Sequence, residues 1–282
     1  MRMYRALIII VMASLTGCIP EPLPVGEIPK AQPKIVISSQ MVPDQGLVVT
    51  VTKSFGALEA GENSNLETVL DQIVVDDAIV TIHYQNQIDT LVNLDNGLYG
   101  TTTTEWEEGT AYELHVFATD LGEVTATAEV SKRVPFDDAS LTLIPSGNGS
   151  DSLLQIDYSL NDPVGKNYYV ISVQRYRSEN DFSEYIDPRI FNHLIEDTEF
   201  EGQHFGNSFK ILWPRFHQGD TVALFMSSVS EEYYKFLEVQ KDSEFSLVEF
   251  ISEPMNYPTN VKGGYGYFNL HFPDVRLFEL EE

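Results

Sequence analysis

Two stretches in the middle of the chain decide the class of fold: Tyr112-Glu-Leu-His-Val-Phe-Ala118 and, five residues later, Val124-Thr-Ala-Thr-Ala-Glu-Val130. In both, apolar or small side chains alternate with polar ones, which is the period of a β-strand with one buried face. β-branched and aromatic residues, which favour strands, are frequent in them. The two stretches therefore predict two strands of a sheet.

Similar runs precede them, at residues 35–37, 47–52, 78–84 and 88–94. Asp95-Asn96-Gly97 is the strongest turn signal in the chain, because Asn and Gly both tolerate positive φ. Short strands with period-2 patterning at this spacing indicate a β-sandwich. We expect an immunoglobulin-like β-sandwich over residues 34–134.

The second half is also mostly strand, and we expect a C-terminal β-rich, sandwich-like domain over residues 135–282. Its clearest runs are 141–143, 153–158, 168–174, 208–213 and 221–227, with a less regular insert at about 178–206. Residues 230–239 predict a helix: Ser230 is a natural N-cap, and Glu231 and Glu232 favour the positive end of the helix dipole. The fold class expected is all-β, with two β-sandwich-like domains and one short helix near the C-terminus.

The N-terminus has the pattern of a secretory signal peptide, which we assign to residues 1–17. Arg2 and Arg5 precede an apolar run too short to span a bilayer, which takes about 20 residues. Leu15-Thr16-Gly17-Cys18 resembles a bacterial lipobox, in which the cysteine is lipidated. An ordinary cleaved signal beside a free thiol is the alternative. Residues 18–33 are rich in proline and predict an extended tether.

The expected location is the outer membrane, with the protein held there through a lipid anchor on Cys18. Ile19 follows the cysteine, so the aspartate that retains some lipoproteins at the inner membrane is absent. The face of the membrane is left open. The formal charge of −26 comes from 43 acidic and 17 basic residues, and a chain of this charge repels nucleic acid.

The remaining sequence gives no catalytic signature. No two of the six histidines have metal-ligand spacing, no Gly-x-Ser-x-Gly stretch occurs, and the single cysteine excludes disulfides within the chain. Asp71, Asp76 and Asp77 carry oxygens that suit calcium, but without EF-hand spacing. We therefore expect no catalytic residues, no metal site and no cofactor.

The stretch Gly263-Gly264-Tyr265-Gly266-Tyr267-Phe268 is the best candidate for a special backbone, because closely spaced glycines allow main chains to approach one another. One interpretation is a contact surface with Tyr265, Tyr267 and Phe268 as anchors. The other is a structural turn before the last strand. The aromatic cluster at 213–217 poses a similar choice, between core packing and carbohydrate stacking.

Several motifs occur in an order that resembles a family of Bacteroidetes lipoproteins, labelled domain of unknown function 4249. These motifs are Pro33-Lys34-Ile35-Val36, Asp77-Ala78-Ile79-Val80, Gly97-Leu98-Tyr99, Gly219-Asp220-Thr221-Val222, Tyr233-Tyr234-Lys235-Phe236 and Asn260-Val261-Lys262-Gly263-Gly264. Tyr265 and Tyr267 depart from the family pattern, which has small or aliphatic residues there.

The resemblance implies a cell-envelope partner of TonB-dependent outer-membrane transporters, with no assigned biochemical activity and no catalytic residues. We expect a non-catalytic binding accessory to such a transporter in nutrient uptake. The alternatives are a structural or adhesive surface lipoprotein and a secreted hydrolase with an unrecognised site.

Overall fold

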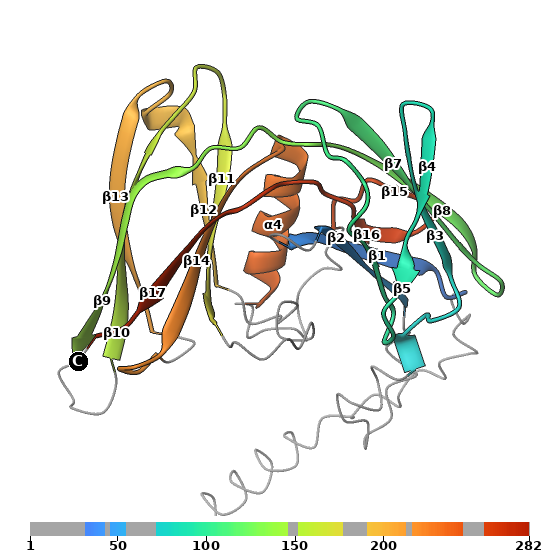
Figure 1. Cartoon of the computed structure of the whole chain (residues 1–282), viewed down its shortest axis with the longest axis horizontal. Coiled ribbons are helices and arrows are strands. Elements are labelled where there is room, and N and C mark those ends of the chain that lie inside the picture. The colour runs from blue at the N-terminus through green and yellow to red at the C-terminus, as the bar shows by residue number, and fades with distance from the viewer. Residues whose placement is uncertain are drawn as a thin grey trace, which may run out of the picture. The chain divides into compact units, whose positions relative to one another are not determined.

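The computed structural model describes residues 32–42, 46–54, 72–145, 152–176, 191–212, 216–244 and 257–281 (Figure 1). The signal segment, Cys18 and most of the tether lie outside this part of the chain, as do residues 43–45 and 213–215. All the strands described below belong to one unit, Pro33–Glu282.

The first half of the chain forms two stacked sheets. One contains, in spatial order, β1 (Ile35–Val42), β2 (Gly46–Lys53), β6 (Leu98–Thr101) and β5 (Val92–Asn93). The other contains β8 (Gly122–Glu129), β7 (Ala111–Ala118), β3 (Ile79–Tyr84) and β4 (Gln87–Thr90). If the strands are lettered in chain order, with β1 as A and β4 as C′, the spatial orders of the two sheets are A-B-E-D and G-F-C-C′. These are the strand orders of immunoglobulin-type sandwiches.

A tyrosine corner strengthens this likeness. Tyr112 stands near the start of β7, the strand equivalent to F, where immunoglobulin-type domains have such a tyrosine. Its hydroxyl donates to the Glu105 carbonyl at 2.7 Å and accepts from the Glu107 amide at 2.9 Å. The ring is 1% exposed. The predicted all-β class, with packed sheets, is confirmed.

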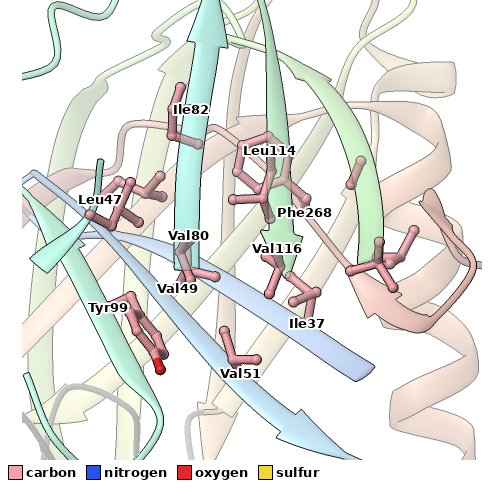
Figure 2. Packing of buried hydrophobic residues seen from close by; sticks show 14 of the residues in the cluster. Ile37, Leu47, Val49, Val51, Val80, Ile82, Tyr99, Leu114, Val116 and Phe268 are labelled. Atoms are coloured by element: carbon pink, nitrogen blue, oxygen red, sulfur yellow. The ribbon is translucent and has the colours of Figure 1, made fainter. Parts of the chain in front are cut away.

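The predicted alternation places one face of each strand in a shared core. In β7, Tyr112, Leu114, Val116 and Ala118 are buried while the residues between them are partly or fully exposed. Figure 2 shows Leu114 and Val116 together with side chains of the opposite sheet and with Phe268, which comes from far along the chain.

The Asp95-Asn96-Gly97 signal forms the turn between β5 and β6, and all three residues have positive φ. The run expected as one strand at 88–94 is divided into β4 and β5, which belong to opposite sheets. The division falls at Leu91, whose side chain is buried and whose amide donates to the Val80 carbonyl at 2.9 Å.

The second half forms another pair of sheets. One contains β9 (Phe136–Pro145), β10 (Ser152–Asn161) and β13 (His204–Ile211). The other contains β12 (Phe191–Glu196), β11 (Tyr168–Arg175), β14 (Thr221–Val229) and β17 (Asp274–Glu279). In the same lettering the orders are A-B-E and C′-C-F-G. The insert expected at 178–206 thus contains β12, the 3-10 helix η1 (Asp197–Glu199) and the start of β13.

The connection between β14 and β17 carries the helix α4 (Glu231–Glu244). As predicted, Ser230 caps it: the Tyr233 amide donates to the Ser230 hydroxyl at 3.2 Å. Tyr234 and Leu237 of α4 pack on Tyr168 and Val170, on the face of β11 that points away from the sandwich core. No helix in the described ranges is long and apolar enough to cross a membrane.

After α4 the chain returns to the first sandwich and adds a strand to each of its sheets. β15 (Val261–Lys262) pairs with β8, and β16 (Tyr265–Tyr267) pairs with β1 in parallel. Val261, Phe268 and Leu270 join the first core. The domain boundary expected at 134/135 assigns these residues to the second domain. Their return depends on apolar side chains that complete a distant core, which strand patterning does not reveal.

Candidate functional site

A cleft of about 640 Å³ lies where the returning segment, the start of α4 and the end of β8 meet. It is lined by Glu108, Gly109, Thr127, Ala128, Glu129, Val130, Ser131, Lys132, Asn167, Ser228, Val229, Ser230, Glu232, Tyr233, Asn260, Tyr267, Phe268, Asn269, Leu270 and His271. Both sandwiches and the helix therefore contribute to it. We call it the α4 cleft.

Two asparagines fix the returning segment along this cleft. The Asn260 amide group donates to the Phe268 carbonyl at 2.7 Å, and its oxygen accepts from the Phe268 amide at 2.9 Å. The Asn269 backbone amide donates to the Ser39 hydroxyl at 2.8 Å, and the Asn269 side-chain amide donates to the Ser39 carbonyl at 3.0 Å. The segment is thus bonded to β1 by side chains as well as by strand pairing.

Aromatic rings form one wall of the α4 cleft. The Tyr233 ring lies 5.1 Å from that of Tyr267 and 5.6 Å from the imidazole of His271, measured between centroids. Phe236 lies 5.3 Å from Tyr267. Burial raises the pKa of Tyr233 and of Tyr267 and lowers the pKa of His271 to about 4. All three rings are therefore uncharged at neutral pH.

Two buried polar atoms of the cleft lining have no hydrogen-bond partner within the part of the chain that the structure describes. These atoms are Asn269 Oδ1 and His271 Nδ1. Asn269 is only 6% exposed. A buried polar atom without a partner costs free energy, so such atoms mark places where a ligand or water supplies the missing bond.

The charged side chains of the cleft lining are predominantly acidic. Glu108, Glu129 and Glu232 line it against one ammonium group, that of Lys132. With His271 neutral, the formal charge of the lining is negative, like that of the whole chain. The site thus combines acidic groups, an aromatic wall, the unmatched oxygen of Asn269 and an unmatched ring nitrogen of His271.

The three expected anchors are separated by the structure. Tyr265 is 48% exposed and does not line the α4 cleft; the Lys34 ammonium lies 5.1 Å from its ring centroid. Tyr267 lines the cleft and is 7% exposed. Phe268 also belongs to the cleft lining, but it is fully buried in the first core, where a partner cannot reach its ring.

Two glycines of this segment are required by the close approach of the backbone to β1. Gly266 has φ +91°, and a Cβ there would stand 1.9 Å from the Ile37 carbonyl oxygen of the paired strand. At Gly264 the same test gives 2.4 Å to the Ile35 carbonyl oxygen. Close backbone pairing of β16 with β1 therefore requires glycine, in agreement with the structural interpretation of this stretch.

The other residues considered from the sequence form no metal site in the described ranges. No group of three or more His, Cys, Asp or Glu side chains suited to a metal occurs there. The Asp76 carboxylate accepts the Gly97 amide at 2.5 Å, and Asp71 lies outside the described residues. His83 and His115 stack at 4.1 Å between neighbouring strands.

Buried carboxylates occur away from the α4 cleft and are already bonded. Asp162 accepts the hydroxyl of Tyr169 and, at 2.7 Å, the amide of Gly202. Asp274 accepts the Phe136 amide at 3.1 Å and an Arg276 nitrogen at 3.2 Å. These groups stabilise the second sandwich and its junction with the first.

Fold and site together define an all-β protein of two immunoglobulin-type sandwiches with a cleft beside helix α4. The chain belongs to the family described as domain of unknown function (DUF4249), whose model matches residues 21–271. A search among curated proteins finds no match.

Proposed function

We propose that this protein is a lipid-anchored cell-envelope protein that binds without catalysing, as an accessory to a TonB-dependent outer-membrane transporter. The anchor is on Cys18, and the proline-rich tether at 18–33 separates the folded part from the membrane surface. The family match over 21–271 is consistent with this role, which rests on the motifs from the lipobox to the glycine-rich segment.

The observation that carries the binding role is the α4 cleft. It is large enough for a small molecule, since ligand pockets span about 300–1,000 Å³. Its lining offers unmatched polar atoms and an aromatic wall, which are features of binding sites. The buried carboxylates Asp162, Asp197 and Asp274 do not line the cleft.

The anchor is tested by Cys18→Ser. We expect the variant to move from the membrane fraction to the soluble fraction and to lose incorporation of an alkyne-labelled palmitate. Ser14→Ala, which keeps the cysteine, should fractionate like the natural protein. Unchanged fractionation of Cys18→Ser would refute lipidation at this residue, because a thiol-linked chain is the only anchor that the change removes.

The partnership is tested by affinity purification of the lipidated protein from detergent-solubilised native membranes, followed by mass spectrometry. A TonB-dependent transporter should be enriched with the natural protein and depleted with Cys18→Ser. Recovery of a partner-free monomer after mild crosslinking would contradict the accessory role.

A further inference from the structure

We propose that the α4 cleft binds a small cationic molecule, one that presents an ammonium or guanidinium group to Asn269 and to the surrounding carboxylates. This inference rests on the proposed binding role and adds the chemical class of the ligand. Three features of the lining point to it independently: the unmatched oxygen of Asn269, the charge and the aromatic wall.

The orientation of the Asn269 amide decides what the ligand must offer. Its partner on β1 is the Ser39 carbonyl oxygen, which can only accept, so the nitrogen of the amide faces Ser39. The atom left without a partner is therefore the oxygen, Oδ1, an acceptor. A ligand that satisfies it must donate a hydrogen bond, as ammonium and guanidinium groups do.

His271 adds a second unmatched polar atom two residues along the same segment. Its Nδ1 has no partner in the described part of the chain. Because burial lowers its pKa to about 4, the ring is neutral near pH 7, and one of its two nitrogens is then an acceptor. A neutral ring does not repel a cation, whereas an imidazolium would.

The charge of the lining selects the sign of the ligand. Glu108, Glu129 and Glu232 outnumber Lys132, so the field in the α4 cleft favours cations and disfavours anions. The surrounding chain, at −26, acts in the same direction. These carboxylates are exposed to solvent, so their effect on a cation is strongest at low ionic strength.

The aromatic wall suits a cation as well. The rings of Tyr233 and Tyr267 lie 5.1 Å apart and both line the cleft. Ring faces attract ammonium and guanidinium groups, and the attraction grows as the pair is removed from water. Acceptors, carboxylates and aromatic rings thus converge on one kind of ligand.

The experiment titrates the purified Cys18→Ser protein with three acetylated tripeptide amides. They have alanine at both ends and lysine, glutamine or glutamate in the middle. Calorimetry at low ionic strength gives the dissociation constants. We expect the lysine tripeptide to bind about tenfold or more tighter than the glutamate tripeptide, with the neutral one between them.

A pair of matched variants locates the effect. Glu129→Gln with Glu232→Gln removes two carboxylates from the α4 cleft. Glu105→Gln with Glu201→Gln removes two exposed carboxylates that do not line it, for the same change in net charge. The first pair should weaken binding of the lysine tripeptide by about tenfold, and the second by about twofold or less. In NMR spectra the lysine tripeptide should shift the signals of the Asn269 side-chain amide and the Ala128 methyl.

Three results would overturn the inference: glutamate tripeptide binding as tightly as lysine tripeptide, equal effects of the two variant pairs, or no binding of any tripeptide at millimolar concentration. None of these affects membrane fractionation or transporter recovery. Failure of the ligand class is therefore distinguishable from failure of the proposed function.

Discussion

The two sandwiches have the same strand order but different edges. Strands A-B-E face strands C′-C-F-G in both, with the short β5 added in the first. In the first sandwich, β8 and β1 are covered by β15 and β16. In the second, the outer strands β9, β13, β12 and β17 have no such additional neighbour in the described sheets. The strands that cover the first sandwich come from the F–G connection of the second.

This difference shows how one half of the chain stabilises the other. An uncovered edge exposes unpaired backbone groups, and short added strands satisfy them. The added segment also places Phe268 and Leu270 in the first core. The same segment, with α4, forms much of the α4 cleft. The cleft therefore exists only because the second sandwich has a long F–G connection.

The largest effect should come from breaking the added parallel strand with Gly266→Val. A Cβ at this position would stand 1.9 Å from the Ile37 carbonyl oxygen, so β16 must separate from β1. We expect the free energy of unfolding to fall by about 3–5 kcal/mol, measured by urea denaturation.

Gly122→Ala is the matched control, because Gly122 also has positive φ but nothing lies within 4 Å of its Cβ position. It should cost only the strained φ, about 1–2 kcal/mol. Equal losses for the two variants would mean that the pairing of β16 with β1 contributes nothing to stability.

The next largest effect is the pH dependence of stability that comes from His271, which lies where the chain leaves the first sandwich for β17. Burial lowers the pKa of His271 from 6.5 to about 4, so the unfolded chain binds its proton first as the pH falls. Stability from this residue is complete above pH 6.5 and is lost between pH 6.5 and about 4. We expect a loss of up to about 3 kcal/mol in urea denaturation across this range.

His271→Gln is the comparison, since glutamine does not titrate. Its curve of stability against pH should be flatter than that of the natural protein over the same window. A residual slope is expected from His193 in the second sandwich, whose pKa is also lowered by burial. Parallel curves for the two proteins would show that His271 is not buried as the structure has it.

The smallest effect is expected from removing a buried tyrosine hydroxyl, one in each sandwich. Tyr112 bonds backbone groups of Glu105 and Glu107, whereas Tyr169 donates to the Asp162 carboxylate. Bonds to charged groups contribute more, so Tyr169→Phe should cost about 2–3 kcal/mol and Tyr112→Phe about 1–2 kcal/mol. Thermal denaturation measures both, and the reverse order would contradict the assignment of the stronger bond to the second sandwich.

Much of the fold follows from local sequence. The alternation in 112–118 matches β7, the Asn96-Gly97 signal matches the turn after β5, and Ser230 begins α4 as expected. These features depend on strand period, positive φ and capping, which are properties of neighbouring residues. β12 was missed, because its residues fall in a segment whose pattern is irregular over a longer range.

The site was only partly predictable. Its glycine-rich segment stood out, and of the three residues chosen as anchors Tyr267 and Phe268 line the cleft, whereas Tyr265 does not. Asn269 and His271 follow the chosen stretch and alternate with the buried Phe268 and Leu270, a signal that was present but weak. Which face of this alternation meets α4 cannot be found from spacing alone.

The sequence by itself determined the all-β class, the helix and its cap, the turn at 95–97 and the acidic charge, because each depends on composition or on residues close along the chain. Only the tertiary structure decided that residues 261–270 complete the first sandwich and that Asn269, Tyr233 and the cleft carboxylates meet. Many of those contacts join residues more than a hundred positions apart, as Ser39 and Asn269 are, and they form only when the packing of both cores brings them together.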